Sequence, residues 1–374
     1  MKKLLSFLYI AVCAGIGFWL GYLSLEGGLI FEFTVFQLGL LFMSLLVFGC
    51  LHILIHEAGH LIAGKLSGYH MIFIRIFSWA LVKEGEKFRF AKFSIAGTGG
   101  QCLMVPPKMT DGALPPYKLY LWGGVLANFA ASGISLLAAV FLTHSVYLYS
   151  FAAIGILLGL TNIFPYFITD GMQLKQLKND TIKQQQFFQQ LHLTEAFTLG
   201  KTYDSLDMNA LIVNPNEPNT EQYNTYIQLV KINHELEASN FGHALDILKP
   251  LWQQRVDLIQ PYQMEVMREY LFCHLTLELQ ETTIQEDILG DKLFKEYMKL
   301  KQLESYRLQA AVAFYVERDI EKAEEWLQKA REALDKAPTY ADKVLNTTLL
   351  NGLSQKIKKD KAEKITASSL KQGL

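Results

Sequence analysis

Residues 56–60 read His-Glu-Ala-Gly-His within a long apolar run, and this placement constrains the chain more than any other feature. Two histidines four residues apart project from one face of a helix, so both imidazoles can reach a single Zn²⁺ ion. Glu57 follows the first histidine, where a carboxylate can act as general base on a water at the metal. The preceding segment Phe33–Ile55 contains no Asp, Glu, Lys or Arg. The pattern therefore predicts a metal site within a membrane helix, with His56 and His60 as ligands and Glu57 as the base.

The alternative is a helix in which two histidines are satisfied by neighbouring carbonyl groups. A membrane setting weighs against it, because a charged Glu57 at that depth costs about 2.5 kcal/mol or more and needs a partner. Ala58 and Gly59 are small, which allows another helix or a peptide to approach the metal closely. We therefore favour the metal site.

The chain has 374 residues, of which 51% are hydrophobic, but the apolar residues are concentrated before about residue 180. Four segments are long enough to cross a hydrocarbon core, which takes about 20 residues. They are Leu4–Leu25, Phe33–Lys65, Tyr117–Thr143 and Ser145–Ile168. The sequence thus predicts a membrane domain of about four spans over residues 1–180.

Basic residues alternate with span number, which predicts the orientation of the spans. Lys2 and Lys3 precede the first span, and the next connection, Glu26–Glu32, has no Lys or Arg. The long connection Ser67–Pro116 carries several basic residues, as does the segment after the fourth span. We expect a multi-pass protein of the cell membrane with both termini in the cytosol.

The connection between the second and third spans has strand-like patterns at Met71–Phe77 and Lys87–Ile95. The charged turn Lys83–Glu86 is expected to join them as a small β-hairpin, and Gly97–Gly100 to form a flexible stretch that re-enters the membrane near the metal. An exposed hairpin edge there could clamp an extended peptide by strand addition. A surface hairpin followed by a linker is an equally weighted alternative.

A hydrolytic zinc site usually has three protein ligands and a water. Asp170 stands near the end of the fourth span, on the same side of the membrane as His56 and His60 by the orientation above. Pro165 ends or kinks the helix, and Gly171 permits a turn that aims Asp170 inward. Without the histidines, Asp170 and Gly171 would indicate a simple helix-terminating turn. With them, Asp170 is the expected third ligand.

These motifs together resemble the site-2 protease family of intramembrane zinc metallopeptidases. The likeness covers about residues 34–175, in the family's order. Besides His56–His60, it rests on Ser94–Gly100, Gly123–Phe129, Asn162 with Pro165, and Asp170 with Gly171. Two departures are Val125, where the family usually has proline, and Phe167-Ile168-Thr169 in place of a second proline pair.

The resemblance implies a Zn²⁺ cofactor held by His56, His60 and Asp170, with Glu57 as general base. It implies that Asn128 and Asn162 position the substrate or the backbone of the third ligand, and the glycine-rich loop with Gly99 and Gly100 is predicted to help position substrate. His52, one turn before His56, would have to reach about 6 Å further along the axis to ligate the same ion. We expect His52 to line a water path or to pair with another span.

Residues 181–374 contain no further span, and their pattern is helical throughout. Arg307–Lys336 fits the small and large positions of a tetratricopeptide-like helix pair, and Asn240–Leu248 is a weaker echo. The spacing of the two does not suit a regular array, so we expect an irregular helical domain in the cytosol. It could bind a cytosolic protein partner, although alanines at this spacing are also common in ordinary helix packing.

The sequence therefore predicts a mainly α protein: membrane helices with a β-hairpin insert, then a soluble tetratricopeptide-like domain. The expected function is cleavage of membrane-anchored protein or peptide substrates in or near their transmembrane segments, in contact with the lipid bilayer. The alternative is a non-catalytic membrane scaffold with a vestigial zinc site and a partner-binding helical domain. A net charge of −1 without a basic tract argues against nucleic-acid binding.

Overall fold

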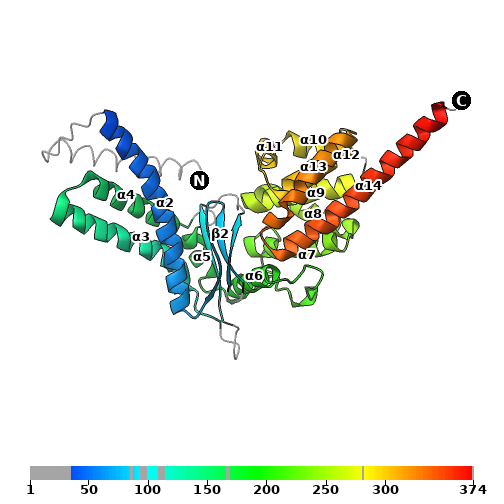
Figure 1. Ribbon diagram of the computed structural model, residues 1–374. Helices are drawn as coiled ribbons and strands as arrows, with labels where there is room; N and C mark the ends of the chain where they lie inside the picture. The colour runs from blue at the N-terminus through cyan, green and yellow to red at the C-terminus, as the bar shows by residue number, and fades with distance from the viewer. Residues whose placement is uncertain are drawn as a thin grey trace. The chain divides into compact units, whose positions relative to one another are not determined.

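The computed structural model describes residues 35–84, 87–92, 99–107, 114–165, 169–279 and 282–372 (Figure 1). This part of the chain is mainly helical and contains an antiparallel sheet of four strands. Its internal contacts divide it into two compact units, one of residues 1–63 with 118–173 and one of residues 64–117 with 174–374. The predicted first span, Leu4–Leu25, lies outside the described residues.

Within its described residues, the first unit contains three apolar helices. They are α2 (Val35–Leu66), α3 (Lys118–Ala138), which a π-helical turn extends to Thr143, and α4 (Val146–Ile163). All three are long and apolar enough to cross a membrane. Large apolar side chains cover their outer surfaces, and Phe42, Ile134 and Leu142 are each more than 60% exposed. Such surfaces are unfavourable in water and suit a lipid environment.

Small residues let the three helices approach closely. A Cβ atom on Gly59 of α2 would lie 2.3 Å from the carbonyl oxygen of Gly123 in α3. Gly155 of α4 meets the His52 ring in the same way, and Gly159 meets Phe129. Close approach of backbones through glycine is typical of membrane helix packing. The expectation that Gly59 admits another helix is confirmed, and that helix is α3.

The sheet is larger than the predicted hairpin. Its strands are β1 (His70–Ile76), β2 (Trp79–Glu84), β3 (Lys87–Lys92) and β4 (Gly100–Val105), in the order β3-β2-β1-β4. The predicted pairing of the first and third strands is wrong, because β2 lies between them. The tight turn after β1 uses Phe77 and Ser78, with Phe77 at φ 53°, and has none of the Gly, Asn or Pro residues that mark turns. The prediction of Gly97–Gly100 as loop is also wrong at Gly100, which begins β4 and pairs with Ile76.

Strands β1 and β4 are mostly buried, whereas β3, at the other edge of the sheet, is exposed. Ile72, Met104 and Val105 are fully or almost fully buried, and β4 packs against α6 (Thr181–Thr198). Strand β3 is an edge strand whose side chains are almost all exposed, including Phe90 at 80%. The sheet, which the prediction grouped with the membrane spans, thus packs with the helices of the second unit.

After α5 (Asp170–Leu177) and α6, the described residues form eight more α-helices. Neighbours along the chain pack in pairs, such as α7 with α8 and α12 with α13. They are α7 (Gln222–Glu237), α8 (Phe241–Gln253), α9 (Gln260–Thr276), α10 (Thr282–Gly290), α11 (Lys292–Met298), α12 (Leu303–Tyr315), α13 (Ile320–Ala333) and α14 (Tyr340–Gln372). The expected helix pair within Arg307–Lys336 corresponds to α12 and α13, and Ala311 and Ala323 are fully buried between helices. Membership of the tetratricopeptide class remains a prediction.

A charged cluster lies inside this helical part. Glu269 of α9, 1% exposed, accepts hydrogen bonds from Arg268 Nε at 2.6 Å and Arg307 Nη2 of α12 at 2.5 Å. Burial acts to raise the pKa of Glu269, but Arg307 and Arg268 outweigh it and the pKa is lowered. The guanidinium of Arg307 also lies 4.4 Å from the centre of the Phe272 ring. These contacts tie α9 to α12.

Candidate metal centre

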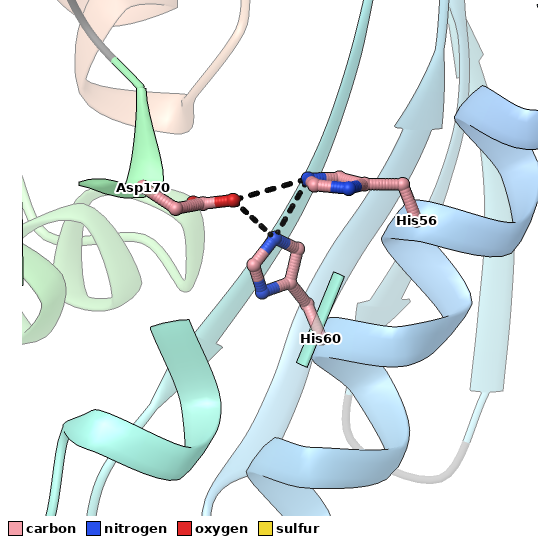
Figure 2. Close-up of side chains that lie close together, drawn as sticks. All are labelled: His56, His60 and Asp170. Carbon is pink, nitrogen blue, oxygen red and sulfur yellow. Dashed lines mark hydrogen bonds and ion pairs between the residues drawn. The ribbon is translucent and has the colours of Figure 1, made fainter. Parts of the chain in front are cut away.

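Three side chains that the sequence singled out converge at one point of the first unit, as Figure 2 shows. His56 and His60 come from the same face of α2, and Asp170 is the first residue of α5. The two Nε2 atoms lie 3.1 Å apart, and Asp170 Oδ2 lies 3.2 Å from His56 Nε2 and 3.3 Å from His60 Nε2. The three atoms thus form a nearly equilateral triangle.

This triangle fits a metal ion. Ligands about 2.0–2.1 Å from a tetrahedral zinc lie roughly 3.3 Å from one another, close to all three distances above. Two imidazoles and one carboxylate are also a usual donor set for such an ion. Three ligand atoms on one face leave a fourth position open for water or substrate. The residues present can therefore hold a metal ion.

The position of Asp170 depends on the chain after α4. The helix ends at Ile163, two residues before Pro165, and Thr169 Oγ1 donates to the Phe164 carbonyl at 2.7 Å and accepts from the amide of Met172. A Cβ on Gly171 would lie 1.9 Å from the carbonyl oxygen of Ile163. Glycine is thus required at position 171 by the close approach to α4, which leaves no space for a side chain. Gly171 is not among the glycines with a positive φ, so the predicted special turn conformation is not what requires it.

Asp170 is suited to remain ionised. Its buried position acts to raise its pKa, but the His56 and His60 side chains outweigh this and lower the pKa to about 2. The N-terminus of α5 also favours a negative charge there. Among the described residues, Oδ2 accepts no hydrogen bond of good geometry, although it lies 3.2 Å from His56 Nε2 and 3.3 Å from His60 Nε2. A buried, ionised carboxylate oxygen that accepts no hydrogen bond is available to a cation.

The partner of each imidazole's other nitrogen decides which nitrogen can bind a metal. His60 Nδ1 donates to the carbonyl oxygen of Tyr120 in α3 at 2.8 Å. The proton of neutral His60 therefore resides on Nδ1, and Nε2 presents its lone pair to the centre of the triangle. Sequence reasoning missed this contact, because a main-chain carbonyl carries no residue-type signal.

A chain of polar contacts supports His56. His52, fully buried, donates from Nε2 to the Phe151 carbonyl of α4 at 3.0 Å, so the Nδ1 of neutral His52 is an acceptor. Asn128 of α3 lies between the two histidines, 3.1 Å from His52 Nδ1 and 3.3 Å from His56 Nδ1. In the structure Oδ1 of Asn128 faces His52 Nδ1 and Nδ2 faces His56 Nδ1, so two acceptors meet at His52. Hydrogen bonding alone distinguishes the two ends of an amide, and the reverse orientation satisfies every group. His56 then donates from Nδ1, and its Nε2 is free for a metal. The expectation that His52 pairs with another span is confirmed, since it contacts both α3 and α4.

Replacing Asn128 by Leu is expected to weaken zinc binding about 10–100-fold, because His56 then loses the group that orients its ring. The measurement is competition with a chromophoric chelator on the purified full chain. Ser135→Ala is the matched control: it removes a buried hydroxyl of the same helix that donates to the Leu148 carbonyl, and it should leave affinity unchanged. Equal affinities in the native and Asn128→Leu proteins would show that Asn128 does not orient the ligand.

The other predicted residues lie as follows. Glu57 is buried, at 6% exposed, and follows His56 in the chain. Gly124 has no space for a side chain, since a Cβ there would lie 2.5 Å from His56 Nε2 and 2.6 Å from His60 Nε2. Asn162 donates to the Leu158 carbonyl of its own helix at 3.0 Å. Gly99 accepts from the Phe77 amide in the second unit, beside Gly100 in β4. Substrate positioning by Asn128, Asn162, Gly99 and Gly100 remains a prediction.

Comparisons of the chain with protein-family models, with curated proteins and with solved structures gave no match.

Proposed function

We propose that this protein is a membrane-embedded zinc endopeptidase that cuts membrane-anchored proteins in or beside a transmembrane segment. The observation that carries the proposal is the triangle of His56, His60 and Asp170, with Glu57 adjacent on a helix apolar enough to cross a membrane. A bound zinc ion supplies Lewis-acid chemistry, polarising a carbonyl and lowering the pKa of a water. The spacing of the ligand atoms and the lone pairs assigned to the two Nε2 atoms support zinc as the ion.

In this scheme the chain's own residues hold the reactants and move the proton. His56, His60 and Asp170 fix the ion, with Tyr120 and Asn128 orienting the imidazoles. Glu57 takes the proton from the attacking water and returns it to the leaving amine. Gly124 keeps α3 close to the ligands without filling the space at their Nε2 atoms.

The edge strand β3 is the proposed binding site for an extended segment of the substrate. Its free edge can add a further strand through main-chain hydrogen bonds, which recognise backbone rather than sequence. A transmembrane helix satisfies its own carbonyls, so the segment to be cut has to unwind before it can react. An extended segment is also the form that a strand edge binds.

The proposed setting is the cell membrane, with the chain crossing it several times and both termini in the cytosol. The three apolar helices support the membrane location, and the alternation of basic residues supports the orientation. The helical domain would then lie in the cytosol.

The test of the proposal compares membrane proteomes of cells that carry the native protein or Glu57→Gln. We expect a single-span protein to accumulate uncleaved in the variant. If no membrane protein accumulates and Glu57→Gln still supports the cellular phenotype, the protein is a scaffold with a vestigial site. The purified variant, which keeps all three ligands, should retain its zinc in either case.

A further inference from the structure

The helical domain contains a groove that the metal centre does not use. It has a volume of about 880 Å³ and lies between α10 and α11 on one side and α12 and α13 on the other. Its floor is apolar and includes Leu289, Met298, Val312, Tyr306 and Trp326. This is the size of a pocket that holds a small ligand or a few side chains of a peptide.

Two aromatic rings dominate the floor. Trp326 of α13 stacks on Tyr306 of α12, with ring centres 5.8 Å apart and planes inclined by 23°. Both rings are only partly buried, so each keeps a surface that a ligand can cover. Met298 lies beside them, and its flexible side chain adapts to different partners. Such a floor is suited to one large apolar side chain.

The rim of the groove is basic. Lys295, Lys299, Lys301 and Lys329 line it, against one carboxylate, Glu296. Lys299 pairs with Glu296 at 2.6 Å, and Lys329 Nζ lies 4.0 Å from the Trp326 ring centre. Within the described residues, neither Lys295 nor Lys301 forms an ion pair, and both are exposed. The groove therefore has a local charge of about +3 on a chain whose net charge is −1.

The basic rim and the apolar floor of the groove favour some kinds of ligand over others. The chain's own C-terminal segment, from Lys356 onward, is rich in lysine, so neither it nor its counterpart in a second copy complements the rim. A membrane surface could attract the lysines, but it is flat and cannot fill a concave floor lined by two aromatic rings. An acidic peptide with a bulky apolar residue satisfies both the floor and the rim.

We propose that this groove binds a short acidic segment of a partner protein. In the bound state a large apolar side chain of the segment covers Trp326 and Tyr306, and flanking carboxylates pair with Lys295 and Lys301. This inference goes beyond the proposed hydrolysis and does not depend on it, because it involves no residue of the metal centre.

The test measures binding of a dye-labelled peptide that has Leu-Trp between two acidic triplets. The full chain is purified into phosphatidylcholine nanodiscs, and a peptide with lysine in place of every acidic residue serves as the control ligand. We expect the acidic peptide to bind saturably and the lysine-containing control peptide not to bind. Added salt should weaken the binding of the acidic peptide. Lys295→Glu with Lys301→Glu should weaken it at least about tenfold, since like charges then face each other.

The control pair is Lys249→Glu with Lys358→Glu, two exposed lysines outside the groove, which should change affinity by less than about twofold. Trp326→Ala should also weaken binding about tenfold or more. Thermal melting confirms folding, and the charge-reversal pair tests the groove even if Trp326→Ala fails to fold. Equal binding by native and charge-reversed chains overturns the proposal. So does binding to phosphatidylserine vesicles that requires Lys295 and Lys301 while the peptide does not bind, because the surface is then a membrane contact.

Discussion

Glu57→Gln is expected to slow substrate cleavage about 10²–10⁴-fold and to leave zinc content unchanged. Gln has the shape of Glu but cannot take a proton from the attacking water, so the variant loses general-base catalysis alone. The measurement is the cleavage rate of the accumulated membrane protein by the purified chain, with zinc content determined on the same sample.

The matched control for this variant is Glu363→Gln, which changes an exposed carboxylate on α14. It should cleave at the native rate. If Glu57→Gln also cleaves at the native rate while the ligands still hold zinc, Glu57 is not the base and the assigned mechanism is wrong. If both rate and zinc are lost, Glu57 has a structural role in the site.

Asp170→Asn is expected to remove zinc from the purified protein and to abolish cleavage. The substitution keeps the side chain's shape but replaces a negative ligand by a neutral amide. The affinity should fall further than the roughly 10–100-fold expected for losing an orienting group outside the ligand set. His56 and His60 would remain as two ligands, fewer than the three protein ligands of a usual hydrolytic zinc site.

Zinc per chain is measured by elemental analysis after dialysis against a weak chelator. Asp246→Asn, which changes an exposed carboxylate on α8, is the control and should retain native zinc. If the native and Asp170→Asn proteins bind zinc with equal affinity, the third ligand is a residue other than Asp170. Together, Glu57→Gln and Asp170→Asn separate loss of the base from loss of the metal.

The ligand triangle could be predicted from the sequence because its chemistry is tied to residue type. The spacing of His56 and His60 fixes a shared helix face, and Asp170 is an acidic residue at the end of an apolar segment. The structure brings the three together as expected. The contacts of the three side chains with α3 could not be predicted. The hydrogen bond from His60 to the Tyr120 carbonyl and the lack of space for a side chain at Gly124 both depend on how α3 crosses α2.

The sheet shows the same limit. Strands β1 and β3 have clear alternation or β-branched residues, and the sequence predicts both. Strand β2 follows a turn made by Phe77 and Ser78, which contains no Gly, Asn or Pro. Strand β4 begins at Gly100, in a glycine-rich stretch that favours a loop. The pairing order depends on contacts between these strands, and local pattern carries no information about it.

Mapping of new protein termini measures directly whether this protein cuts membrane proteins. Membranes from cells with the native protein or Glu57→Gln are compared, and termini created by cleavage are identified by labelling and mass spectrometry. We expect termini inside or beside a transmembrane segment that occur with the native protein and are absent with Glu57→Gln. Identical sets of termini from both, in cells where the native protein is present and holds zinc, would contradict this expectation.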